Sequence, residues 1–458
     1  MSDKKDNQSL RQRLHALIPG GAHTYSRGDD QFPSAAPALL ERGKGAYVWD
    51  ADGRKYLDYG MALRSVTLGY ADERVNAAAI AEIEKGVGLT RASMTELQAA
   101  ERLHDLVRSA EMIKFAKNGS NVTTAAAKIA RAYTGRRYIC VPRQHPFFSF
   151  DDWFIGTTPI KRGVLNEHAE TTLVFDFNDI ASLQALFDQH GSNIAGVMLE
   201  PATHITPCGD CPGTAKWPAK DCANCVMGCR NFLHEVRDLA HRHGALFILD
   251  EMITGFRWHT RGAQYFFGVE PDLATFGKAM ANGFALAAVV GKREFMEVGA
   301  TNKPGMERTF LLSSTHGGEM SALGAFLEAS RICEQEDVPS HLWGYGTSLR
   351  DGMNDLAKRK GIDAHFRAEG PGVALNYVAM DASGMPSPGM RTIFAQEMLR
   401  HGVLIPWISV SQAHGKAELD MTLTACDKAL DIYSRALEDG VALHLEGEAV
   451  KPVFRTFN

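Results

Sequence analysis

Seven short apolar runs between residues 112 and 291 constrain the fold of this chain more than any other feature. Amphipathic stretches separate them; in 230–243, for example, apolar side chains recur at helical spacing. Apolar runs that alternate with helices are typical of a mainly parallel sheet covered on both faces. The sequence therefore predicts an α/β fold. The runs are MIKFA (112–116), RYICV (137–141), TLVFD (172–176), AGVMLE (195–200), ALFILD (245–250), LATF (273–276) and AAVVG (287–291).

The length of 458 residues allows a large domain and a smaller one. Residues 1–71 mix turns with strand-like pieces, and GAYVWDADGRKYLDY (45–59) predicts two strands around an Asp-Gly turn. We expect residues 72–325 to form the large domain. Residues 1–71 and 326–458 are then expected to form a small α+β domain.

Charge and hydropathy exclude several classes of protein. The net charge is −5 and no long run of Lys or Arg occurs, so no nucleic-acid or anionic-membrane partner is expected. The apolar stretches are too short to span a membrane, and the N-terminus lacks the apolar segment of a signal peptide. We expect a cytoplasmic protein that acts on small molecules.

Polar residues follow three of the predicted strands. Asp250 ends one run, Lys278 follows another after a glycine, and Asn-Gly-Ser (118–120) precedes a predicted helix. Ligands of open α/β sheets bind at the carboxyl ends of strands. Gly119 and Ser120, at a helix start, could bind a phosphate. Each feature alone also has a structural explanation: a capped loop, an ion pair, or a lysine whose charge reaches solvent.

Taken together, the three features indicate pyridoxal phosphate as a cofactor. This cofactor needs a lysine for its Schiff base, an acid that keeps the ring nitrogen protonated, and a phosphate site. A buried lysine is an effective imine-forming amine because burial lowers its pKa.

Longer motifs connect the chain to a known family. It resembles the class III pyridoxal-phosphate aminotransferases, in particular the branch of glutamate-1-semialdehyde 2,1-aminomutase. The resemblance covers nearly the whole chain and implies a fold-type I transferase. The motifs are LIPGGAHTYSR (17–27), GKGAYVWDADGRKYLDY (43–59), FAKNGSNVTTAAAKIARAYTGR (115–136), LEPA (199–202), FILDEMITGFR (247–257), PDLATFGKAMANGF (271–284) and STHGGEMSALGA (314–325).

The resemblance implies roles around the cofactor ring. Lys278 would form the Schiff base and move a proton between carbon atoms, and Asp250 would pair with the pyridinium nitrogen. Met252 would pack on one face of the ring. Phe147 would stack on the ring, and its alternative role is that of a core phenylalanine.

The same resemblance implies how the phosphate is held. Gly119 and Ser120 would bind the phosphate of their own subunit. Thr315 would reach the phosphate of the neighbouring subunit, which makes the protein a homodimer with shared active sites.

Substrate residues are suggested where the chain departs from the family. Arg64 stands where relatives carry a glycine, and it or Arg27 could bind a carboxylate or phosphate; for both, the alternative is a solvated loop arginine. Glu200, at a strand end, is a third substrate candidate. No glutamate stands between Gly402 and His414, where aminomutases carry one in an aromatic stretch. A transaminase acting on another aldehyde or ketone, for instance a keto-sugar, fits better.

Five of the eight cysteines lie between residues 208 and 229. Two Cys-x2-Cys pairs bring four thiolates within reach of one tetrahedral ion. We expect a structural Zn²⁺ site; an iron–sulfur cluster and unligated or disulfide-paired cysteines are alternatives. The expected ligands are Cys208, Cys211, Cys222 and Cys225, with Cys229 as a substitute. The isolated cysteines, expected in apolar packing, are Cys140, Cys333 and Cys426.

The sequence therefore predicts an aminotransferase that moves an amino group from a donor, glutamate, to a carbonyl acceptor in ping-pong fashion. The first alternative is intramolecular transfer by an aminomutase. The second is a metal-cluster protein with a degenerate cofactor pocket.

Overall fold

The computed structural model describes residues 7–207 and 230–458. The chain divides into two compact units. The first comprises Met1–Asp72 and Ser340–Arg455, and the second comprises Glu73–Pro339 and Thr456–Asn458. Each unit therefore joins stretches that are distant in the sequence.

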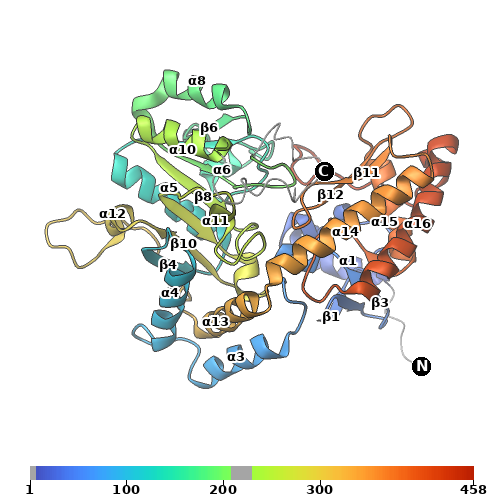
Figure 1. Ribbon diagram of the computed structural model, residues 1–458, viewed down its shortest axis with the longest axis horizontal. Coiled ribbons are helices and arrows are strands. Elements are labelled where there is room, and N and C mark those ends of the chain that lie inside the picture. The colour runs from blue at the N-terminus through green and yellow to red at the C-terminus, as the bar shows by residue number, and fades with distance from the viewer. Residues whose placement is uncertain (1–6, 208–229) are drawn as a thin grey trace. The chain divides into compact units, whose positions relative to one another are not determined.

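The second unit holds a seven-stranded sheet with the order β4-β10-β9-β8-β7-β5-β6, of which β4, β10, β8 and β6 are labelled in Figure 1. The strands from β9 to β6 run parallel, whereas β10 is antiparallel to both β9 and β4. All seven strands coincide with the apolar runs, so the prediction of a mainly parallel α/β sheet is confirmed. They are β4 (Met112–Ala116), β5 (Tyr138–Pro142), β6 (Thr172–Phe175), β7 (Ile194–Leu199), β8 (Leu246–Glu251), β9 (Leu273–Phe276) and β10 (Ala287–Gly291).

Helices connect these strands. The α-helices of the second unit are α3 (Glu73–Glu84), α4 (Met94–Leu106), α5 (Gly119–Thr134), α6 (Asp152–Ile155), α7 (Asn166–Ala169), α8 (Ile180–His190), α10 (Phe232–Arg242), α11 (Ala263–Phe266), α12 (Arg293–Met296) and α13 (Met320–Gln335). The 3-10 helices are η4 (Gly191–Asn193), η5 (Lys278–Ala281) and η6 (Glu297–Gly299).

The sheet is covered on both faces. Helix α5 packs on β7, β9 and β10, while α10 packs on β7 and β8 and also contacts α8. Because successive side chains of a strand point to opposite faces, Ile248 of β8 joins the core cluster under α5. Asp250, two residues further on, shares that face. The apolar stripe predicted in 230–243 is buried, at Phe232, Leu233, Val236, Leu239 and Ala240.

The first unit holds a four-stranded sheet, β1-β2-β3-β13, and a separate antiparallel pair, β11–β12. Strands β2 and β3 form the hairpin expected from 45–59, and Gly53 adopts φ +80° in its turn. Strand β13 lies far along the chain and pairs parallel with β3. The strands are β1 (Leu40–Lys44), β2 (Tyr47–Asp50), β3 (Lys55–Asp58), β11 (Phe366–Glu369), β12 (Asn376–Ala379) and β13 (Val403–Leu404).

The remaining helices are α1 (Asn7–Leu17), α2 (Met61–Arg64), α14 (Val338–Arg359), α15 (Pro388–Arg400) and α16 (Lys416–Asp439), with the 3-10 helices η1 (Pro19–Gly21), η2 (Tyr25–Arg27), η3 (Asp29–Gln31) and η7 (Val441–Leu443). Among the described residues, no helix combines the length and the apolar character needed to cross a bilayer. The isolated cysteines Cys140, Cys333 and Cys426 are buried, as expected.

Candidate active site

The two predicted catalytic residues lie at the carboxyl ends of neighbouring parallel strands. Asp250 is close to the end of β8, and Lys278 follows β9 after a single glycine. The register of the two strands places Asp250 beside Thr275. The positive charge of Lys278 is close enough to lower the pKa of Asp250. The tertiary structure therefore brings the acid and the lysine to one edge of the sheet.

The Asp250 carboxyl group is buried, with 2% of the residue exposed. Burial raises its pKa to about 6, opposed by hydrogen bonds and by the charge of Lys278. The backbone N–H of Met252 donates to Oδ1 at 3.0 Å, and the hydroxyl of Thr275 donates to the same atom at 2.9 Å. Neither bond uses Oδ2, so this second oxygen can accept a hydrogen bond from a ligand.

Met252 lies against two of the strand ends. A Cβ atom built on Gly119 would lie 3.0 Å from Met252 Sδ, and one built on Gly277 would lie 2.7 Å from it. The glycines that follow β4 and β9 are thus close to this side chain. Lys278 then adopts φ +44°, in the left-handed region that non-glycine residues avoid. Such conformations persist where the surrounding structure imposes them, frequently at functional sites.

The predicted phosphate residues form the first turn of α5. Asn118 caps the helix, because its side chain accepts the N–H group of Asn121 at 3.0 Å. Ser120 is buried, and its Oγ accepts the N–H group of Phe150 at 3.0 Å. That bond leaves the hydroxyl proton of Ser120 unused. The free N–H groups of a helix start and a hydroxyl donor suit an anion.

Phe147 is not a core residue. The residue is 45% exposed and its ring meets that of Phe154 edge-on at a centroid distance of 5.9 Å, while the neighbouring Phe148 is 2% exposed. The loop behind the exposed ring is fixed to α5, because Thr123 Oγ1 donates to the Phe148 carbonyl at 2.7 Å. The structure therefore presents Phe147 on a well-anchored loop.

A buried histidine, His145, is hydrogen-bonded to the backbone of the predicted substrate residue Glu200. The N–H group of Glu200 donates to Nδ1 of His145 at 3.0 Å, so the ring proton of this histidine resides on Nε2. Burial lowers the pKa of His145 to about 3, which keeps the ring neutral. Sequence reasoning missed both His145 and Thr275. Only the pairing of strands could have indicated Thr275, and no local motif marks His145.

Thr315 is exposed in the segment between η6 and α13. A Cβ atom on the nearby Gly317 would lie 3.3 Å from the carbonyl oxygen of Phe115, so this segment passes the end of β4. The structure contains one subunit, and the predicted contact with a neighbouring phosphate stays a prediction.

Arg64, in the first unit, ends a left-handed turn. All residues of α2 (Met61–Arg64) have φ between 41° and 68°, a conformation that costs roughly 1–2 kcal/mol per L-residue. Asp58 holds the turn by accepting the N–H group of Met61 at 2.9 Å and the hydroxyl of Tyr70 at 2.7 Å. The turn contains no glycine, so the sequence did not signal it.

Arg27 lies in the same unit, exposed at the end of η2. Burial raises the pKa of the Tyr70 hydroxyl, and Arg27 is close enough for its charge to oppose that effect. Tyr70 also accepts the N–H group of Ala62, within the left-handed turn, at 2.9 Å. Tyr70 therefore lies near Arg27 and is hydrogen-bonded to the turn that ends at Arg64.

The five clustered cysteines, and with them the predicted metal ligands, lie outside the described residues. The segments before and after these cysteines are joined by a hydrogen bond from the N–H group of Phe232 to the Pro207 carbonyl at 3.1 Å. Within 7–207 and 230–458, no group of three or more His, Cys, Asp or Glu residues could hold a metal ion. The zinc prediction therefore depends on the cysteines alone.

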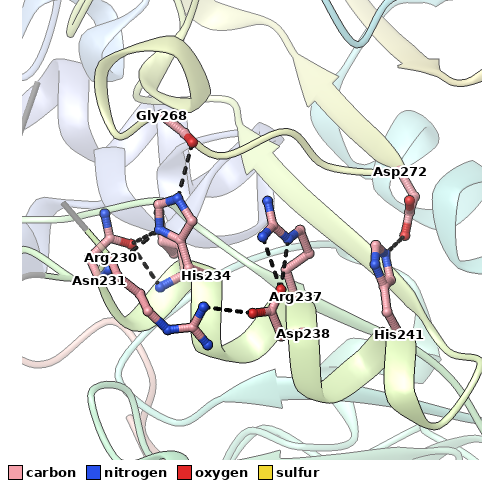
Figure 2. Close-up of polar contacts among 9 residues, drawn as sticks. Arg230, Asn231, His234, Arg237, Asp238, His241, Gly268 and Asp272 are labelled. Carbon is pink, nitrogen blue, oxygen red and sulfur yellow. Dashed lines mark hydrogen bonds and ion pairs between the residues drawn. The ribbon is translucent and has the colours of Figure 1, made fainter. Parts of the chain in front are cut away.

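Figure 2 shows the start of α10, which follows the cysteine-rich stretch. Nε2 of His234 donates to the Gly268 carbonyl at 3.0 Å, and Nδ1 lies 3.1 Å from Oδ1 of Asn231. Because both ring nitrogens of His234 have polar partners within the chain, neither is available to bind a metal ion. Asp238 pairs with two arginines, Arg230 and Arg237.

The chain matches the family model described as "Aminotransferase class-III" over residues 25–217 and 223–437. It is 30% identical over 400 residues to 3-aminobutyryl-CoA aminotransferase of Cloacimonas acidaminovorans, covering 87% of this chain and 89% of that protein. It is 29% identical over 451 residues to glutamate-1-semialdehyde 2,1-aminomutase of Nitrosospira multiformis, covering 92% and 98%.

Solved structures show the same similarity. The FumI protein of Sphingopyxis sp. MTA144, solved in its PLP internal aldimine form, matches with a TM-score of 0.81 and 26% identity over 96% of this chain and 98% of that chain. An omega-transaminase from Sphaerobacter thermophilus matches with a TM-score of 0.77 and 24% identity, covering 96% and 98%. At that lower identity the likeness concerns the fold alone.

Proposed function

The chain belongs to the class III aminotransferases and has the fold-type I architecture, and on that premise we propose that it is a pyridoxal-phosphate-dependent aminotransferase. It would move an amino group from a donor, glutamate, to an aldehyde or keto acceptor. The observation that carries the proposal is the buried carboxylate of Asp250 at the end of β8, under the influence of Lys278 at the end of β9. The relative from Cloacimonas acidaminovorans is itself an aminotransferase by name.

The residues at the strand ends fit this cofactor. Oδ2 of Asp250 can accept a hydrogen bond from a pyridinium N–H. The positive charge of the pyridinium would favour the ionised form of the Asp250 carboxyl group, whose pKa is raised by burial. Gly119 could offer its backbone N–H at the start of α5 to a phosphate, and the Ser120 hydroxyl proton is available to it. Met252 lies against Gly119 and could cover one face of a flat ring.

Pyridoxal phosphate supplies an aldehyde for reversible attachment of amines and a ring that withdraws electrons. The residues of the chain would hold and direct it. Lys278 Nζ would anchor the cofactor and carry the proton that leaves the substrate carbon. Asp250 Oδ2 would keep the proton on the ring nitrogen, and the exposed ring of Phe147 would exclude water from a ring face.

Transfer to an external acceptor is favoured over intramolecular transfer. The stretch between Gly402 and His414 contains no glutamate, in contrast to the aminomutase pattern that it resembles. A keto-sugar or related carbonyl metabolite is the proposed acceptor. Arg27, Arg64 and Glu200 are the proposed contacts for its polar groups.

A half-reaction screen tests the proposal. The protein is loaded with the amine form of the cofactor, candidate carbonyl compounds are added, and the return of the aldehyde absorbance is recorded. A keto-sugar or another aldehyde or ketone should restore it. Rapid formation of 5-aminolevulinate from glutamate-1-semialdehyde without a donor would establish the aminomutase instead. A protein that never takes up the cofactor would contradict both.

The assembly and the metal are separate proposals. We propose a homodimer in which Thr315, exposed in a single subunit, completes the phosphate site of the partner. We also propose one Zn²⁺ on the cysteine-rich stretch; on either side of that stretch, Phe232 and Pro207 are joined by a hydrogen bond. Metal analysis of the purified protein should find about one zinc per chain, lost in the double variant C208S/C211S. Iron and a brown colour would identify a cluster instead.

A further inference from the structure

Thr275 is completely buried on β9, beside Asp250 on the neighbouring parallel strand. Residues in register on adjacent strands point to the same face of a sheet. The Thr275 hydroxyl donates to Asp250 Oδ1 at 2.9 Å. The backbone N–H of Met252, two residues after Asp250, donates to the same oxygen. Two donors on one oxygen fix the rotation of the carboxyl group.

We propose that Thr275 is a positioning residue that orients the Asp250 carboxylate so that Oδ2 faces the ring nitrogen of the cofactor. The inference rests on the proposed function and deepens it. Thr275 itself has no exposed surface and would not touch the cofactor or the substrate. It acts only through Asp250.

The electrostatic surroundings explain why this hydrogen bond matters. Burial raises the pKa of Asp250, while the Met252 N–H, the Thr275 hydroxyl and the charge of Lys278 lower it. On the other side, the pairing of Leu199 with Leu249 places Glu200, the next residue after β7, alongside Asp250. Thr275 is one of three groups that favour the ionised form of Asp250, together with the Met252 N–H and Lys278.

The neighbouring residue on β8 supplies a matched control. Glu251 points to the opposite face, and its Oε2 accepts the hydroxyl of Thr254 at 2.8 Å. Thr254 is also completely buried. Thr275→Val and Thr254→Val therefore each remove one threonine–carboxylate hydrogen bond from adjacent residues, with the same small change of side-chain volume.

The experiment measures the dissociation constant for pyridoxal phosphate and the pH dependence of the bound cofactor's absorbance. In Thr275→Val we expect affinity roughly tenfold weaker, as loss of a hydrogen bond to a charged group predicts. The acidic midpoint of the absorbance titration should move upward by about one pH unit, since the carboxyl group then holds its proton to higher pH. Thr275→Ser, which keeps the hydroxyl, should restore both values, and Thr254→Val should leave both at wild-type values.

Two results would overturn the inference alone: wild-type affinity and midpoint in Thr275→Val, or equal changes in Thr275→Val and Thr254→Val. The second would mean that the hydroxyl contributes only to stability. A wild-type protein that binds no pyridoxal phosphate would overturn the proposed function and this inference with it.

Discussion

Asp250 illustrates how function and stability conflict at the scale of a single residue. Its pKa in the folded chain is about 6, above the ordinary value of 3.8, because the group is buried. A raised pKa means that its contribution to stability is fully present below about pH 4 and is lost as the pH rises through 6. Above pH 6 the ionised, cofactor-free group costs about 3 kcal/mol. A cationic ring nitrogen would offset that cost.

Asp250→Asn should therefore stabilise the cofactor-free protein at high pH while abolishing tight cofactor binding. We expect its free energy of unfolding to exceed that of wild type by up to about 3 kcal/mol at pH 8, and the difference to shrink toward zero near pH 4. Urea unfolding of both proteins at pH 4, 6 and 8 measures this. A difference that does not change with pH would contradict the raised pKa.

Lys278→Ala should eliminate turnover and the covalent attachment of cofactor. Borohydride reduction followed by peptide mass spectrometry should find the cofactor mass on the peptide with residue 278 in wild type and on no peptide in the variant. Lys292→Ala is the control, since Lys292 is a partly buried lysine whose Nζ binds Asp272 at 2.9 Å. An active Lys278→Ala enzyme would refute the assignment.

At the scale of elements, α5 does more than supply a phosphate site. Hydroxyl groups on its first two turns bind the loop that follows Phe147: Thr123 Oγ1 donates to Phe148, and Ser120 Oγ accepts from Phe150. The helix thereby couples the predicted phosphate site to the loop of the exposed aromatic ring. Val122, Ala126 and Ile129 of this helix are buried, whereas Tyr133 is 46% exposed.

Thr123→Val tests this coupling. It leaves the carbonyl of Phe148 without its donor, so we expect the stability of the protein to fall by about 1–3 kcal/mol and the cofactor affinity to fall with it. Thr134→Val is the matched control at the other end of the helix, where the hydroxyl donates to Ala130 at 2.7 Å. It should leave cofactor affinity unchanged. Equal effects of the two variants on affinity would argue against the coupling.

At the scale of the whole molecule, the chain builds both units from segments that are distant in the sequence. The proposed homodimer extends this principle, because Thr315 would act on the partner's phosphate. A homodimer with two-fold symmetry would then contain two identical, shared sites.

Mixing two inactive or weakened variants tests the shared site. A heterodimer of Lys278→Ala and Thr315→Ala would hold one site with both defects and one intact site. After subunit exchange, at a cofactor concentration that fills intact sites but not Thr315→Ala sites, we expect about one quarter of wild-type activity, since half of the dimers are mixed and each has one good site. If each subunit used its own Thr315, the mixture would show half the activity of Thr315→Ala, because half of the subunits would lack Lys278.

The seven strands, the buried face of 230–243 and the candidates Asp250 and Lys278 could all be predicted from the sequence. Apolar runs and helical periodicity are local properties, and a polar residue at the end of an apolar run is visible without a structure. Motif likeness added Met252, Ser120 and Phe147 as expected partners of a cofactor.

Which groups contact one another is visible only in the folded chain. The pairing of β8 with β9 places Thr275 on Asp250, and the packing after β5 places His145 on Glu200. The left-handed turn that ends at Arg64 depends on Asp58 and was not visible either. Strand register, burial and backbone strain arise from contacts between residues far apart in the chain, and no local pattern of side chains encodes them separately.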